Sequence, residues 1–95
     1  MRAARRDQNE KDIVTALRKC GATVERLYSL QAGVPDLVAG IDGRNYLLEI
    51  KMPKTGRLSD AQKEWRDSWR GGKPFILRDA TDVVAFVQLV KGGVK

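Results

Sequence analysis

The sequence contains no histidine and a single cysteine, Cys20, and these two scarcities exclude several kinds of site. Without histidine there is no Ser–His–Asp or Cys–His catalysis, no histidine general base and no His-ligated zinc. One cysteine cannot form an intramolecular disulfide or a four-cysteine zinc site, and it fits a reducing compartment. Any reactive site in this chain therefore has to be built from other side chains.

Long apolar runs are also missing. No stretch approaches the roughly 20 apolar residues that a helix needs to cross a bilayer. Residues 1–6 are basic but lack the apolar run of a secretion signal. With no repeat, low-complexity tract or linker, we expect one domain over residues 1–95 that does not enter a membrane, with residues 1–6 as a flexible basic arm.

What the sequence does have is positive charge. Its 18 basic and 12 acidic residues give a net charge of +6, and 42% of the residues are apolar, as in a soluble globular protein. Excess positive charge attracts polyanions, so nucleic acid is the first partner to consider. The alternative is that the charge serves only solubility.

Glycine and proline divide the chain into short segments with recognisable patterns. Apolar spacing and β-forming residues predict a helix over 7–20, strands over 23–30, 36–41 and 44–51, a helix over 59–70, a strand over 73–78 and a helix over 80–91. Ser59 and Gln62 have the spacing of a capping box at the start of the middle helix. The order α-β-β-β-α-β-α predicts an α/β fold with a mixed central sheet flanked by helices.

The dipeptide Asp42-Gly43 between two apolar runs is a strong signal for a β-hairpin. A two-residue loop there fixes the register, and the same register carried outward puts Asp36 directly opposite Glu49. Their Cβ atoms would be about 5 Å apart on one face of the sheet. A three-residue loop would break this arrangement.

Like charges that face each other destabilise a sheet, so a compensating cation is expected. Lys51 follows Glu49 by two residues and projects from the same face, whereas Leu48 and Ile50 project from the opposite face, which resembles core. The alternative is a structural ion pair between Lys51 and one of the two acids.

Glu10 adds another carboxylate to this group. It lies in the middle of the apolar stripe that Ile13, Val14 and Leu17 form on the first helix, so it would face the sheet. Alternatively, it is an exposed acid that favours the helix dipole. Three carboxylates and a lysine around one cleft suggest a hard divalent cation such as Mg²⁺ or Mn²⁺.

These residues resemble the virus-type replication-repair nuclease (VRR-Nuc) domain of the PD-(D/E)XK superfamily. The resemblance covers about residues 8–90 and is carried by Glu10, Gly33-Val34-Pro35-Asp36-Leu37, Glu49-Ile50-Lys51, Leu58-Ser59 and Gln62. It implies a restriction-endonuclease-like core and a metal-dependent DNase. Stand-alone domains of this kind are typical of phages and bacteria, which implies a cytoplasmic location.

The resemblance also implies roles for the site residues. Asp36, Glu49 and the Ile50 carbonyl would bind Mg²⁺, for which Mn²⁺ can substitute, and Glu10 would help through a metal-bound water or a second ion. Lys51 would orient or activate the attacking water. Gln62 would lie beside the site.

The middle helix and the loop before it carry the candidate DNA contacts. Basic side chains that can bind phosphate are Lys54, Arg57, Lys63, Arg66 and Arg70. On the helix they are mixed with acids, so a solvated face is the alternative. Trp65 and Trp69 are expected to pack into the core.

The last helix is apolar almost all round, so one face can pack on the sheet while the rest needs another cover. We expect a homodimer, in which paired sites suit two cuts in branched DNA. A fully buried helix or a strand in a monomer is the alternative.

The function expected from the sequence is a Mg²⁺- or Mn²⁺-dependent endodeoxyribonuclease that selects branched DNA such as four-way (Holliday) junctions. The alternatives are a catalytically silent DNA-binding or assembly module, a flap or single-strand nuclease, and a small basic interaction protein with a structural ion pair.

Overall fold

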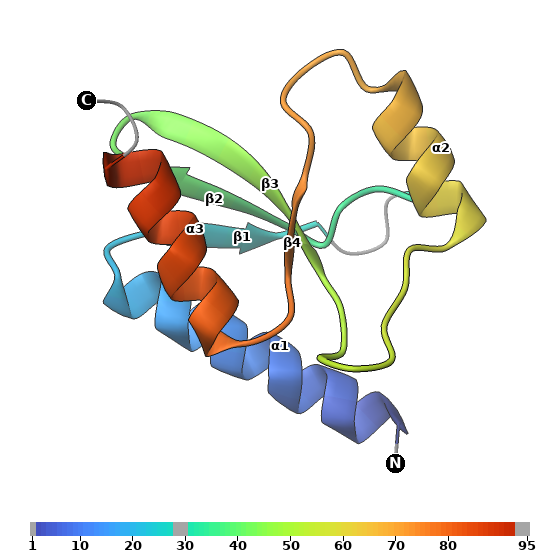
Figure 1. Ribbon diagram of the computed structural model, residues 1–95, viewed down its shortest axis with the longest axis horizontal. Helices are drawn as coiled ribbons and strands as arrows, with labels where there is room; N and C mark the ends of the chain where they lie inside the picture. Colours follow the sequence, from blue (N-terminus) through green and yellow to red (C-terminus); the bar gives the residue numbers. More distant parts are fainter. Residues whose placement is uncertain (1, 28–30, 93–95) are drawn as a thin grey trace.

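The computed structural model describes residues 2–27 and 31–92. In chain order the elements are α1 (Arg2–Lys19), β1 (Thr23–Arg26), β2 (Leu37–Ile41), β3 (Arg44–Ile50), α2 (Asp60–Ser68), β4 (Phe75–Leu77) and α3 (Ala80–Gly92). The predicted order α-β-β-β-α-β-α is confirmed (Figure 1).

The four strands form one mixed sheet in the order β1-β2-β3-β4. The first three strands are antiparallel, and β4 runs parallel to β3. Asp42 and Gly43 form the turn between β2 and β3 with φ angles of 51° and 80°, which a two-residue type I′ turn requires. The turn pairs Ile41 with Arg44, so the predicted hairpin register is confirmed.

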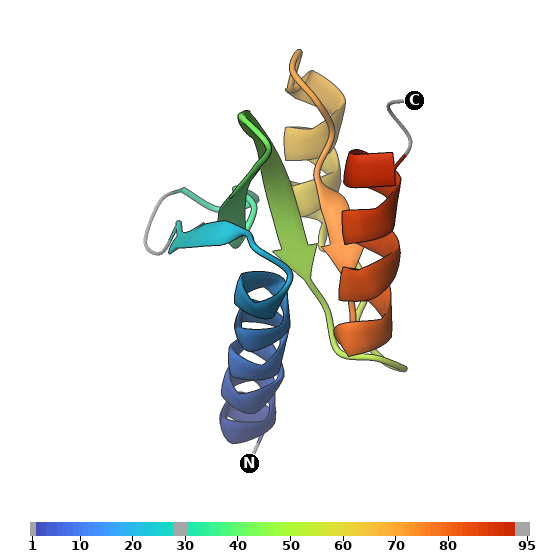
Figure 2. The same cartoon turned by 90° about the vertical axis from the view of Figure 1, so that its left-hand side faces the viewer.

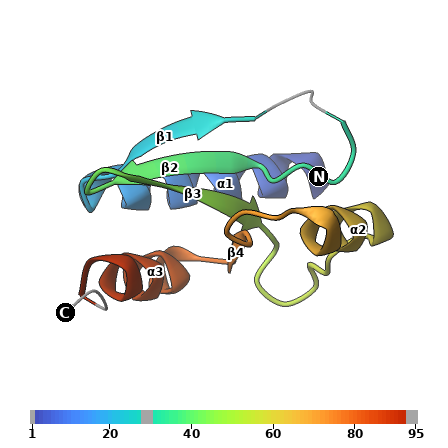
Figure 3. The same cartoon turned by 90° about the horizontal axis from the view of Figure 1, so that it is seen from above.

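The hydrophobic core lies between one face of the sheet and the helices α1 and α3. Its fully buried members are Ile13, Leu17, Leu37, Ala39, Leu48 and Val83. These residues come from the apolar stripe of α1, the inward positions of β2 and β3, and one face of α3, so the helical and strand periodicities meet on a common surface. In Figures 1 and 3, α2 and α3 lie on opposite sides of β4.

Helix α1 begins at Arg2, five residues earlier than its predicted start at residue 7. The backbone of residues 2–6, expected to be a flexible arm, is therefore helical. Alanine and arginine in this stretch are among the best helix formers, and propensity extends the helix beyond the apolar stripe that packs on the sheet. Figure 2 shows this end of α1 projecting away from the sheet. The predicted first strand ends early, at Arg26, and its positions 28–30 lie outside the described residues.

The prediction that Trp65 and Trp69 pack into the core is wrong. Helix α2 contains no buried residue, and the Trp69 side chain is 43% exposed. The two indoles instead stack on each other, with ring centroids 4.5 Å apart and planes inclined by 16°. Spacing by four residues brings two aromatic rings together on a helix, but it does not determine whether that face meets the core.

Helix α3 packs on the core with only one of its apolar faces. Val83, Phe86 and Val87 are buried, whereas Val84 is 48% and Leu89 59% exposed. The described part of the chain has no helix whose length and apolar character would let it span a membrane.

Candidate active site

Asp36 and Glu49 face each other at the end of the β2–β3 hairpin. The paired register ends at Leu37 and Leu48, continuing it by one position puts Asp36 opposite Glu49, and the two side chains are in hydrogen-bond contact. Residue pairs in an antiparallel ladder are alternately hydrogen-bonded and non-hydrogen-bonded. Counting outward from the hydrogen-bonded pair at Ile41, the pair of Asp36 and Glu49 is non-hydrogen-bonded, and the Cα atoms of such a pair are only about 4.5 Å apart. The predicted pairing of the two acids on one sheet face is therefore what the hairpin builds.

Glu49 is the most unusual side chain of the site, because it is a carboxyl group with only 1% of its surface exposed. Its Oε1 accepts a hydrogen bond from Gln62, while its buried Oε2 accepts none from the described residues. Burial raises the pKa of Glu49 from 4.5 to about 8, with a further contribution from the hydrogen bond and charge of Asp36. A protonated Glu49 can donate to Asp36, which an ionised Glu49 cannot.

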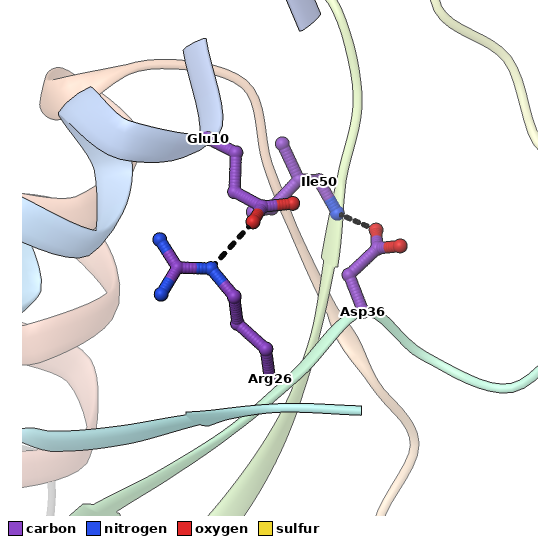
Figure 4. Close-up of polar contacts among 4 residues, drawn as sticks. All are labelled: Glu10, Arg26, Asp36 and Ile50. Atoms are coloured by element: carbon purple, nitrogen blue, oxygen red, sulfur yellow. Dashed lines mark hydrogen bonds and ion pairs between the residues drawn. The ribbon is translucent and has the colours of Figure 1, made fainter. Parts of the chain in front are cut away.

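Pro35 and Asp36 lie where the β2–β3 ladder ends, and they change the hydrogen bonding of the Ile50 backbone. Continuing the register places Pro35 opposite Ile50, and proline has no N–H to donate to the Ile50 carbonyl. The Ile50 N–H instead donates to Asp36 Oδ2 at 2.8 Å (Figure 4). The N–H and C=O of one strand residue point to the same side of the strand, so the Ile50 carbonyl oxygen also lies on the β2 side of β3, where Asp36 lies.

Gln62 connects the sheet to α2. Its Nε2 donates to Glu49 Oε1 at 3.1 Å, and its Oε1 accepts from Lys51 Nζ at 2.6 Å. The same Oε1 accepts from the Ser59 N–H, and the Ser59 hydroxyl accepts from the Gln62 N–H, which confirms the predicted capping box. The residue that caps α2 therefore also fixes the head group of Lys51 beside Glu49.

Two residues that the sequence did not single out support Lys51 and the loop after it. Asn9 of α1 donates from Nδ2 to the Lys51 carbonyl at 3.3 Å. Arg78, just after β4, donates from Nη1 to the carbonyls of Met52 and Gly56 at 3.0 and 2.8 Å. These contacts join segments far apart in the sequence, so no local pattern could have indicated them.

Glu10 lies on the face of α1 that packs against the sheet, as predicted, but it does not join Asp36 and Glu49. Its Oε2 is 2.7 Å from Nε of Arg26, in an ion pair that is partly exposed (Figure 4). Within residues 2–27 and 31–92, no group of three or more acidic, histidine or cysteine side chains is arranged to hold a metal ion. The expected convergence of three carboxylates is therefore corrected to a pair, with Glu10 turned towards Arg26.

The predicted phosphate contacts differ in their surroundings. Lys54, Arg57, Lys63 and Arg70 are exposed. Arg66 is half-buried and donates from Nη1 to the Pro74 carbonyl at 2.7 Å, so it fastens α2 to the segment before β4. Its positive charge also acts to lower the pKa of Glu49.

The arrangement combines groups that suit a hard cation and an attacking water. Two adjacent carboxylates and a backbone carbonyl offer oxygen donors, and the ammonium group of Lys51 is held nearby by an amide. Such donors select Mg²⁺ or Mn²⁺ over softer metals.

Comparisons with known proteins agree with this fold. No protein-family model matches the sequence, and no curated protein matches it. A solved structure described as "VRR_NUC domain" superposes with a TM-score of 0.73 at 20% sequence identity, over 87% of this chain and 94% of that chain. At this identity the likeness establishes a shared fold, in agreement with the fold class that the sequence predicted.

Proposed function

We propose that this protein is a nuclease of the VRR-Nuc type, a metal-dependent endodeoxyribonuclease that hydrolyses phosphodiester bonds in branched DNA. The observation that carries this proposal is the pair Asp36 and Glu49 with Lys51 held beside it through Gln62. The shared fold with a solved VRR_NUC domain supports the same function.

A divalent cation fits the residues that are present. We propose that Asp36, Glu49 and the Ile50 carbonyl hold Mg²⁺, or Mn²⁺ in its place. The buried Glu49 Oε2 supports this, because no described group donates a hydrogen bond to it and a cation would supply the positive partner that a proton otherwise supplies. A bound ion supplies Lewis-acid polarisation of the phosphoryl oxygen and a more acidic water. Glu10, which is paired with Arg26, would contribute to cation binding through a metal-bound water.

Lys51 and Gln62 have complementary roles in this proposal. The ammonium group of Lys51 would orient or activate the attacking water and offset negative charge as it develops. Gln62 would keep Lys51 from turning towards either carboxylate, because its Oε1 accepts from Lys51 while its Nε2 donates to Glu49.

Exposed basic side chains around the site would bind the DNA backbone. Lys54 and Arg57 follow Lys51 in the loop that Arg78 fastens, Lys63 lies on α2, and Arg70 lies two residues after its end. Phosphate contacts of this kind position DNA without reading its sequence. The resemblance to stand-alone phage and bacterial domains supports the cytoplasm of a bacterium or of a phage-infected cell as the location.

A homodimer remains part of the proposal, since two sites related by a twofold axis suit paired cuts in a four-way junction. The exposed Val84 and Leu89 on α3 support a second copy as the cover for this helix. Light scattering over a range of concentrations tests this, and a monomer mass at all concentrations would reject the dimer.

The nuclease proposal is tested by cleavage of labelled four-way junctions, flaps, nicked duplexes and single strands with Mg²⁺ or Mn²⁺. The wild type should cut in the presence of metal, with junctions cut fastest, and the Lys51→Ala variant should not. A wild type that binds these DNAs but never cuts them would favour the silent DNA-binding module. Cutting confined to flaps or single strands would replace the junction preference.

A further inference from the structure

A cavity of about 540 Å³ opens beside α2. Val38 of β2 and Leu47 of β3 line its floor, and Trp69 lines its wall. Asn45 and Lys73 add an amide and an ammonium group to an otherwise apolar lining. These features are distinct from the carboxylate pair, and none of the proposed catalytic roles uses them.

The cavity lies on the same face of the sheet as the candidate active site. Val38 follows Asp36 by two positions and Leu47 precedes Glu49 by two, so all four side chains project from the same sheet face. Same-face neighbours along a strand are about 7 Å apart. That distance is close to the spacing of successive nucleotides in an extended single strand, so a nucleotide next to one bound at Glu49 would lie over the cavity.

The wall of the cavity is an aromatic platform. Trp65 stacks on Trp69, yet 43% of the Trp69 side chain remains exposed. The chain after α2 approaches this indole closely, because a Cβ at Gly71 would lie 2.8 Å from Trp69 Nε1. A stacked, partly exposed indole is the feature with which proteins bind unpaired bases, and such stacking tolerates any base.

The charge around the cavity also suits a nucleic acid strand. Lys73 Nζ donates to the carbonyls of Arg66 and Trp69, so it offsets the negative end of α2 that would otherwise repel a phosphate. Arg70 is exposed in the next position after Trp69.

We propose that this cavity holds an unpaired nucleobase of the DNA substrate, next to the scissile phosphate and stacked on Trp69. The inference rests on the proposed nuclease function and adds a substrate feature to it: the preferred DNA has an unpaired or unstacked nucleotide beside the cut. The amide of Asn45 offers a donor and an acceptor to the base edge.

The test uses the intrinsic fluorescence of the wild-type protein in EDTA, where no cutting occurs. The sequence has two tryptophans, and both belong to the stack of which Trp69 lines the cavity, so the signal reports on this stack. The probes are a fluorescein-labelled oligothymidylate 12-mer and a strand of the same length made of abasic spacers. Fluorescence anisotropy of the label gives the affinity of each strand, and unlabelled copies of both strands serve for the tryptophan titration.

We expect oligothymidylate to bind about tenfold more tightly than the abasic strand, as stacking of one base would give, and to quench the tryptophan emission. The abasic strand should bind without quenching. Trp69→Ala should bind both strands with the same affinity, and Trp69→Phe should keep most of the difference. Because the Trp69 side chain is 43% exposed and lies outside the hydrophobic core, these variants should fold.

A second pair of variants tests the cavity without removing the indole. Gly71→Ala places a methyl group against Trp69, whereas Gly72→Ala meets nothing within 4 Å. We expect only Gly71→Ala to lose the preference for strands with bases.

Equal affinity of the wild type for both strands, with unchanged tryptophan emission, would overturn the proposal. The proposal would also be overturned if the wild type were a dimer that Trp69→Ala converts to a monomer, and if both strands bound with equal affinity. A second copy of the chain would then fill the cavity. The proposed nuclease function has a separate test. A protein that shows base-dependent quenching but no metal-dependent cutting would reject the nuclease function and leave the base-binding cavity standing.

Discussion

Asp36 and Glu49 lie opposite each other across the β2–β3 hairpin although both are acids, and Glu49 is almost completely buried. Two like charges in this position destabilise a sheet. Burial, together with the adjacent Asp36, raises the pKa of Glu49 to about 8. In the absence of a cation, a proton on Glu49 therefore removes one of the two negative charges, and the protein carries a local cost that a bound cation would relieve.

Replacing Asp36 by asparagine should abolish cleavage without unfolding the protein. The asparagine carbonyl can still accept from the Ile50 N–H, while the charge that opposes ionisation of Glu49 is lost. We expect the melting temperature in EDTA at pH 8 to stay the same or rise. A fall of about 5 °C or more, roughly 1 kcal/mol for a domain of this size, would contradict the proposed repulsion.

The stability of the metal-free protein should depend on pH through Glu49. Between pH 4.5 and about 8 the unfolded chain has released the Glu49 proton while the folded chain retains it. The unfolded state then binds fewer protons, so the free energy of unfolding falls as the pH rises through this window and levels off above it. Glu49→Gln should lack this decline.

Urea unfolding of the wild type and of Glu49→Gln in EDTA at several pH values measures this effect. The difference between the two proteins isolates Glu49, because all other titrating groups are common to both. Parallel curves from pH 5 to 9 would show that Glu49 is ionised in the folded state throughout.

Gln62 and Ser59 share one capping box but differ in their contact with the site. Ser59→Ala removes the hydroxyl that accepts from the Gln62 N–H and should cost about 1 kcal/mol. Gln62→Ala should lose a similar amount of stability together with the contacts to Lys51 and Glu49. We expect cleavage to fall about 10- to 100-fold only in Gln62→Ala, as for groups that orient metal-site residues. Equal activity of the two variants would assign Gln62 to helix capping alone.

Gly33 determines how closely the loop before β2 approaches α2. A Cβ at Gly33, where φ is +91°, would lie 2.4 Å from the Ala61 carbonyl oxygen. Gly43 has a φ of +80° but no neighbour within 4 Å, so Gly43→Ala shares the backbone strain without the collision. Gly33→Ala should therefore be less stable than Gly43→Ala by about 1–3 kcal/mol in urea unfolding, the usual cost of overpacking. Equal losses would mean that α2 moves freely.

The hairpin shows what the sequence could predict. Asp42-Gly43 determines the turn, the turn determines the register, and the register brings Asp36 opposite Glu49. Each step is local, so no knowledge of the remaining fold was needed. The capping box at Ser59 was equally accessible, because its partner lies three residues away.

The surroundings of Glu10 and Trp69 show where local patterns fail. The helical stripe placed Glu10 towards the sheet, but its pair with Arg26 depends on how β1 crosses α1. The spacing of the tryptophans puts both on one side of the helix, but it does not determine which surface that side meets. Both outcomes depend on the packing of distant elements.

Calorimetric titration of Mn²⁺ into the metal-free protein tests the central claim most directly. The wild type should bind at the Asp36–Glu49 pair. Binding should be lost in Asp36→Asn and in Glu49→Gln, and it should be unchanged in Glu25→Gln, which alters an exposed acid on β1. A wild type that takes up no Mn²⁺, or an Asp36→Asn variant that binds it with wild-type affinity, would contradict a cation site at this pair.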